Sequence, residues 1–277
     1  MKRLRWWWTA LAVAVVIAAT TGIVDDYGAA YGERAFKRAL VTFAVARTLN
    51  GVISVAQGTE VAVEPGGVGV NFTVGQVLDP VNDLVERFSA VMLVATTSLG
   101  LQNVLLRMVS WWALTALLVV AALISVALVW RAPETAKDGW KRWFLNGFMA
   151  LVFLRFAVPL LIIGTGLVFD TFLAAEQDAA TAALEATREE IETFNQEQTV
   201  AVDEDQSMLD RLATMVDDSL ETMNVRERLE NFKDRVSNAS EHIINLIVIF
   251  VLQTVLLPLA FVWLLLELTK RMASRLT

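Results

Sequence analysis

Cysteine is absent from this 277-residue chain, and histidine, tyrosine and proline are scarce, with one, two and five copies. Without cysteine the chain can form neither disulfides nor thiolate zinc sites. The single histidine, His242, has no cysteine or second histidine to join it, so interfacial packing is its plainest role. No glycine-rich phosphate loop with a lysine and no serine nucleophile elbow occurs. We therefore expect neither an enzyme nor a bound metal or cofactor.

Apolar sequence is abundant, with 56% hydrophobic residues and a mean hydropathy of +0.53. Soluble domains contain about 45–50% apolar residues. Four stretches reach the roughly 20 residues that a helix needs to cross a bilayer: Trp6 to Val24, Trp111 to Trp130, Phe144 to Phe169 and Ile243 to Leu268. Tryptophans near their ends, including Trp6, Trp7 and Trp8, are expected at the membrane–water interface. The prediction is an all-α polytopic membrane protein with four transmembrane helices, long extramembrane helical extensions and a small β-hairpin.

Charge is unevenly distributed along the chain, whose formal net charge is -7. Lysine and arginine flank the apolar stretches at both termini and between the second and third stretches. The segment from Asp170 to Glu241 instead holds 19 acidic and 6 basic residues. By the positive-inside rule, both termini lie in the cytoplasm and two large loops lie outside. We expect a bacterial inner-membrane protein with periplasmic loops, and the acidic excess argues against a nucleic-acid partner.

The sequence allows two alternatives to four retained spans. The stretches Ala39 to Gln57 and Phe88 to Leu106 would give six spans if both crossed, but the acidic segment between them would then be cytoplasmic, against the charge bias. The basic start of the chain also resembles a signal peptide. However, the first apolar run is longer than a signal core, and no Ala-x-Ala site ends it. Four retained spans are the simpler interpretation.

The resulting order alternates spans with loops. It comprises transmembrane helices at 1–24, 109–130, 143–169 and 243–268, an outer region at 25–108, a cytoplasmic loop at 131–142, an acidic outer helical hairpin at 170–242 and a cytoplasmic tail at 269–277. In the outer region, we expect an amphipathic helix from Gly32 to Gln57 and a β-hairpin at 59–74 around Glu64-Pro65-Gly66-Gly67. Asp79-Pro80 is then expected to open a helix at 79–108.

The acidic hairpin carries apolar residues at alternating spacings of four and three, the pattern of a heptad seam. The candidate interaction seam consists of Leu173, Leu184, Ile191, Phe194, Leu229, Phe232 and Val236. Its plainest role is packing within the chain. A sharper hypothesis is that polar seam members such as Gln177, Thr187 and Gln198 leave part of the stripe for other subunits.

Arg155 is the most unusual residue in the apolar stretches, because it lies 12 residues after Trp143 and 14 before Phe169. This spacing predicts a position near the bilayer midplane, where a charge costs roughly 2.5–3.5 kcal/mol. With no acidic residue expected at that depth, Gln253 and Thr254 are the predicted partners. Pro159 and Pro258 are predicted to kink their helices. The arginine would then serve as an interhelical lock or bias an anion path.

These features favour a non-catalytic membrane scaffold or assembly protein, whose outer helices bind copies of itself or another membrane or envelope protein. The alternative is an oligomeric ion channel, made anion-selective by Arg155. A further alternative is an accessory sensor subunit. The expected partners are the lipid bilayer and either a second copy of the chain or another envelope protein.

Overall fold

The computed structural model describes residues 2–57, 74–131, 138–201 and 238–276, and helices are the only regular elements in these ranges. The predicted all-α class is confirmed for this part of the chain. Residues 59–73 of the predicted β-hairpin lie outside the described residues, and Val74 already belongs to a helix. Residues 202–237 of the predicted acidic hairpin also lie outside the described residues.

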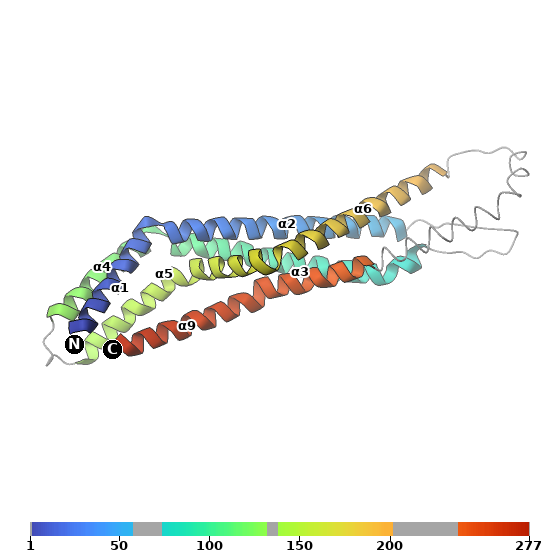
Figure 1. Cartoon of the computed structure of the whole chain (residues 1–277). Coiled ribbons are helices and arrows are strands. Elements are labelled where there is room, and N and C mark those ends of the chain that lie inside the picture. Colours follow the sequence, from blue (N-terminus) through green and yellow to red (C-terminus); the bar gives the residue numbers. More distant parts are fainter. Residues whose placement is uncertain (1, 58–73, 132–137, 202–237, 277) are drawn as a thin grey trace, which may run out of the picture. The chain divides into compact units, whose positions relative to one another are not determined.

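Figure 1 labels most of the helical elements of the chain. In chain order they are α1 (Lys2–Thr21), α2 (Ile23–Gln57), α3 (Val74–Val109), α4 (Trp112–Arg131), α5 (Asp138–Phe172), α6 (Ala174–Ala201), a helical segment at 238–251, the π-helix η1 (Leu252–Leu256) and α9 (Leu257–Leu276). α2, α3 and α5 contain 35, 36 and 35 residues. At 1.5 Å per residue, each is about 50 Å long and exceeds the roughly 30 Å hydrocarbon core of a bilayer.

Within the described ranges, five helices are long and apolar enough to cross a membrane. They are Ile23–Val55, Val81–Val109, Trp112–Arg131, Gly139–Phe172 and Asn238–Met272. The set differs from the four predicted stretches, because the two stretches assigned to the outer region belong to the continuous helices α2 and α3. The first predicted span corresponds instead to a shorter apolar helix, Arg5–Thr21. These long apolar helices support an integral membrane protein.

Three predicted helix boundaries also need correction. α2 begins at Ile23, nine residues before the predicted start at Gly32. α3 begins at Val74 rather than at Asp79, so Pro80 lies inside it. One missing N–H removes a single hydrogen bond, which a helix of 36 residues can lose without ending. The expected continuous helix beyond the third span is interrupted at Leu173, between α5 and α6.

The chain divides into two compact units. Unit 1 comprises residues 1–38, 96–172 and 251–277, and unit 2 comprises residues 39–95 and 173–250. Each unit collects segments that are distant in sequence, so its core is formed by contacts between helices rather than within one of them. The two units are described separately below.

The core of unit 1 lies between α1, α4 and α5. α1 contributes its buried residues at spacings of four, three and four, namely Trp8, Ala12, Val15 and Ala19. Such spacing places them on one face of the helix. Leu118 and Ala122 of α4 and Phe148 of α5 are among the residues that complete the cluster. Alanines at the contact let helix backbones approach closely, as is common between helices in membranes.

Trp8 differs from the expectation that three consecutive tryptophans lie at the membrane interface. Its side chain is 2% exposed, whereas Trp6 and Trp7 are 64% and 73% exposed. Its indole Nε1 donates a hydrogen bond to Ser125 Oγ over 3.2 Å. Because successive helical residues point about 100° apart, one of the three turns into the core.

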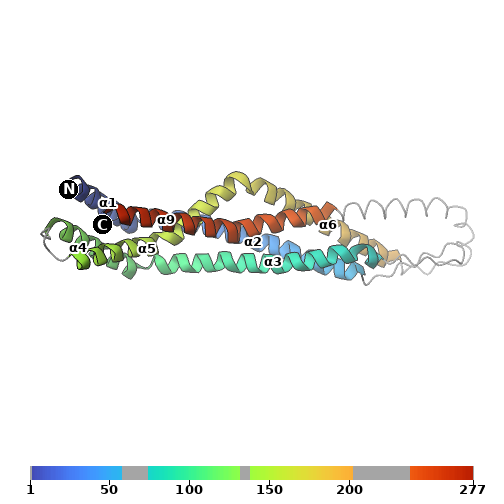
Figure 2. The ribbon, with the colours of Figure 1, turned by 90° about the horizontal axis from the view of Figure 1, so that it is seen from below.

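One end of unit 1 is rich in basic residues. Figure 1 and Figure 2 place the start of α1, the start of α5 and the end of α9 at the same end of this unit. The basic residues found there are Arg5, Arg131, Lys141, Arg142, Lys270 and Arg271. This end of unit 1 therefore carries a local excess of positive charge.

Unit 2 has a core formed by α2, α3, α6 and the helical segment 238–250. The largest buried apolar side chains come from all four: Leu49, Ile53, Phe88, Met92, Leu184, Ile191 and Phe250. The opposite face of α6 is charged, since Asp178, Glu185 and Glu189 are exposed. α6 is therefore amphipathic, with an apolar stripe toward the core.

Candidate functional site

The junction between α1 and α2 positions an acidic side chain of unit 1. α1 ends at Thr21, and Gly22 has a φ of 68°, a conformation that favours glycine because it has no Cβ. α2 then begins with Asp25 and Asp26 in its first turn, where negative charge is favoured by the helix dipole. The Asp26 N–H donates to the Gly22 carbonyl over 2.9 Å and closes the turn.

Asp25 pairs with Arg155, the arginine of α5 that the sequence singles out. Arg155 Nη1 donates to Asp25 Oδ1 over 2.8 Å, and Nη2 bonds to Asp25 Oδ2. Arg155 Nε also lies 3.4 Å from Thr115 Oγ1 of α4. The arginine side chain is 1% exposed and that of the aspartate 17%. The guanidinium thus uses its planar fork to join α2, α4 and α5.

This pairing corrects the prediction that Gln253 and Thr254 partner Arg155. The prediction treated Asp25 as lying outside the first span and concluded that no carboxylate reached the depth of Arg155. In the structure, α2 begins directly after Gly22, and its first-turn carboxylate meets the long arginine side chain of α5. The sequence does contain one indication of this pairing, because the acidic residues Asp25 and Asp26 directly follow the first apolar stretch.

The energetic consequence of the pair is asymmetric. A buried ion pair contributes little net stability compared with apolar residues of similar size, because both charges lose their hydration. Removing one partner is costly, by about 3–5 kcal/mol, because the other charge is left buried and unpaired. The pair therefore selects one arrangement of α2, α4 and α5 over others.

A second ion pair of unit 1 is more exposed. Arg38 Nη2 lies 2.9 Å from Asp170 Oδ1, and Arg34 Nη1 lies 3.6 Å from Asp170 Oδ2. The Arg38 guanidinium also lies 4.3 Å from the centre of the Phe169 ring. These side chains are 26–55% exposed. Exposed pairs contribute about 0–1 kcal/mol, so this group is much less costly to break than the Arg155 pair.

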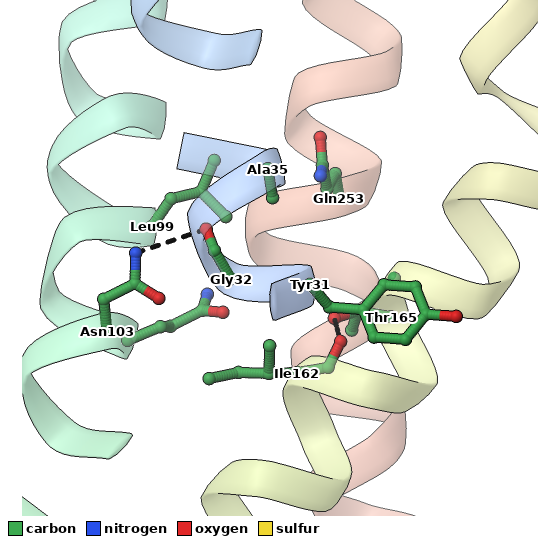
Figure 3. Close-up of a pocket in the computed structure, with 10 residues that line it drawn as sticks. Tyr31, Gly32, Ala35, Leu99, Asn103, Ile162, Thr165 and Gln253 are labelled. Atoms are coloured by element: carbon green, nitrogen blue, oxygen red, sulfur yellow. Dashed lines mark hydrogen bonds between the residues drawn. The ribbon is translucent and has the colours of Figure 1, made fainter. Parts of the chain in front are cut away.

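Unit 1 also contains a small polar pocket, shown in Figure 3. Its volume is about 10 Å³. It is lined from four helical segments by Tyr31, Gly32, Ala35, Leu99, Gln102, Asn103, Ile162, Thr165, Gly166 and Gln253. Asn103 Nδ2 donates to the Gly32 carbonyl over 3.2 Å, marked by a dashed line in Figure 3. A Cβ on residue 32 would overlap Asn103 Oδ1, so a larger residue there would force the Asn103 amide to move.

Gln253 reaches the pocket from the π-helix η1. It is 4% exposed, and η1 is followed by α9, in which Pro258 is the second residue. Pro258 cannot donate to the carbonyl of Thr254. The sequence predicted a kink here, and the structure has a five-residue π-helix. Such π-helical turns are frequent at functional sites. Thr254 is half-buried in the same turn. Pro159 is buried inside α5, which remains one continuous helix through it.

The described members of the predicted seam belong to unit 2. Leu184 and Ile191 are buried in its core, and Leu173 is half-buried. Gln177 is also buried, and its Nε2 donates to Thr42 Oγ1 of α2 over 3.4 Å. These positions pack within the chain. Phe194, Leu229, Phe232 and Val236 lie outside the side chains that the structure describes.

Among the described residues, no group of three or more histidine or acidic residues is arranged to hold a metal ion. Comparison of the chain with protein-family models, with curated proteins and with solved structures gave no match.

Proposed function

We propose that this chain is a non-catalytic integral membrane scaffold, whose unit 2 lies outside the bilayer and binds copies of itself or another envelope protein. The observation that carries the proposal is the combination, in unit 2, of a charged helix with exposed apolar side chains on the other helices. The charged helix supports a location in water. The exposed apolar side chains support a partner.

The charge of α6 supports the location in water. Its exposed acidic residues are Glu176, Asp178, Glu185, Glu189 and Glu192. Each charged side chain at the centre of a bilayer costs roughly 2.5–3.5 kcal/mol on insertion scales. α6 packs against α2 through Gln177 and Thr42, so these two helices belong to the same environment. The proposal therefore places unit 2 in the aqueous phase.

Large apolar residues are exposed on three helices of unit 2. They are Leu40 and Val41 of α2, Leu93 and Val94 of α3, and Ile244 and Val248 of the segment 238–251, with exposures of 46–67%. Single exposed apolar residues are common on protein surfaces. Leu40 and Val41 are adjacent in sequence, as are Leu93 and Val94, and apolar residues exposed in groups are typical of a surface that binds a protein. We infer that these residues contact the partner.

The proposal retains four spans, with α1, α4, the first part of α5 and the helix ending with α9 in the bilayer. The first part of α2 is excluded because Glu33, Arg34, Lys37 and Arg38 place four charges within six residues. The remainder of α2 is assigned to water because it packs against the charged helix α6. The basic end of unit 1 supports a cytoplasmic location for both termini by the positive-inside rule. The bilayer is then a bacterial inner membrane, with unit 2 in the periplasm.

The anion-channel alternative has less support from the described residues. Arg155 is 1% exposed and holds a carboxylate with two nitrogens. An anion would have to displace Asp25 before it could interact with the guanidinium. The scaffold is therefore the function that the geometry favours.

The test compares two double variants of α3 in the full-length protein. Leu93 and Val94 are exposed apolar neighbours, and Glu86 and Arg87 are exposed charged neighbours on the same helix. After gentle extraction, native mass spectrometry should find the chain in a complex, either homo-oligomeric or with a second protein. L93S/V94S should release the monomer at least tenfold more readily, while E86S/R87S should preserve the complex. A wild-type chain that is monomeric and captures no neighbour by crosslinking in membranes would refute the proposal.

A further inference from the structure

The polar pocket between α2, α3, α5 and η1 has a side chain whose hydrogen-bonding capacity is unused. We propose that it binds one ordered water molecule, which connects Gln253 of η1 with Asn103 of α3 and Thr165 of α5. The inference is independent of the scaffold proposal, because it concerns only unit 1.

The size of the pocket suits a single water. A cavity needs roughly 10–15 Å³ for one water molecule, together with two to four polar partners. The pocket has a volume of about 10 Å³. Its lining includes the amides of Gln102, Asn103 and Gln253 and the hydroxyl of Thr165. A lipid tail or an organic ligand would be too large.

Gln253 contributes a largely buried amide to the pocket. Its side chain is 4% exposed, and no hydrogen bond joins its amide to another described residue. An unsatisfied buried polar group costs about 1–3 kcal/mol. Gln253 lines the pocket, where a water can accept a hydrogen bond from its Nε2. The π-helical turn thus carries a buried amide that a water would satisfy.

The other two partners offer acceptors. Asn103 uses Nδ2 to bond the Gly32 carbonyl, which leaves its Oδ1 available. Thr165 Oγ1 donates to the carbonyl of Leu161 over 2.9 Å, so the lone pairs of its oxygen remain free. One water can donate to these two oxygens and accept from Gln253. Three hydrogen bonds are the usual number for a buried water.

A water fits this site better than a cation, because the lining contains no carboxylate. The nearest acidic residues along α2 and α5 are Glu33, which pairs with Lys37, and Asp170, which pairs with Arg38. A cation in a neutral, buried site would lose its hydration without a compensating charge. The pocket therefore selects a neutral ligand.

The experiment is water-edited solid-state NMR on the full chain in lipid vesicles, with labelled glutamine side chains. Gln177 of unit 2 is a matched control, because it is 2% exposed and its Nε2 donates directly to Thr42. Magnetisation from water should reach Gln253 Nε2 at least threefold faster than Gln177 Nε2. Gln253→Met assigns the signal by removing it.

Ala35→Val fills the pocket and should slow the transfer to Gln253 to the rate of Gln177. Ala116→Val adds the same bulk at an exposed position of α4 and should change nothing. Unchanged thermal unfolding of unit 1, followed by the fluorescence of its tryptophans, shows that each variant has folded. Transfer to wild-type Gln253 no faster than to Gln177 would overturn the proposal. So would a shift of the Gln253 signal in sodium chloride relative to choline chloride, because the occupant would then be a cation.

Discussion

Among the described residues, unit 1 buries an ion pair, Arg155 with Asp25, whereas the buried polar side chains of unit 2, such as Thr42 and Gln177, are neutral. The tryptophans are also unevenly distributed between the units, since all nine lie in unit 1. In the proposed arrangement, the four spans of unit 1 are surrounded by lipid, which gives apolar helices no reason to associate. Specific polar bonds and close packing must then orient its helices. Unit 2 can rely on burial of apolar surface from water.

The largest expected effect comes from breaking the ion pair of unit 1 on one side only. Asp25→Leu leaves the arginine buried and uncompensated, so we expect a loss of about 3–5 kcal/mol in the free energy of unfolding. Arg155→Met should cost about as much. The double variant should recover most of the loss, because neither charge remains. Thermal unfolding in lipid discs, followed by tryptophan fluorescence, measures the stability of unit 1.

Asp26→Leu is the control for this experiment, because Asp26 occupies the same helical turn and is exposed. It should change stability by no more than about 0.5 kcal/mol. A loss in the double variant equal to the sum of the losses in Asp25→Leu and Arg155→Met would show that the two residues act independently, contrary to the pairing.

The second expected effect concerns the core of unit 2. Leu184 is fully buried, and Leu184→Ala should cost about 2–5 kcal/mol through lost burial and the cavity left behind. Hydrogen exchange should rise in α6, while the tryptophan signal of unit 1 should stay unchanged. Glu189→Ala, at an exposed position of the same helix, should have little effect. A parallel shift of the tryptophan signal would show that the two units unfold together.

Sequence patterns predicted some features of these units well. The helical class follows from apolar runs of sufficient length, and the alternating spacing around Leu184 and Ile191 indicated a stripe that is buried in the structure. Such features depend on periodicity within one helix. The sequence could therefore identify them without knowledge of neighbouring helices.

Contacts between helices were harder to predict. The depth of Arg155 was inferred from its position within one apolar stretch, but its partner is 130 residues away, after a turn at Gly22. Pro258 indicated a disturbed helix, yet not that a π-turn would carry Gln253 to a pocket. The count of spans failed to match the long apolar helices because α2 and α3 are apolar over most of their length. Hydropathy alone does not separate a lipid-facing helix from one buried against protein.

The smallest expected effect tests whether a single polar contact contributes to the α1–α4 packing of unit 1. Trp8→Phe retains an aromatic ring but removes the hydrogen bond to Ser125 Oγ. A hydrogen bond contributes about 0.5–1.5 kcal/mol, and we expect a loss within that range in lipid discs. Trp7→Phe is the matched control, since Trp7 is the adjacent residue and is 73% exposed. Equal effects of the two variants would mean that the tryptophans act only through their membrane position. A larger effect at Trp8 would show that one member of the cluster orients α1 against α4, because only that member turns toward the core.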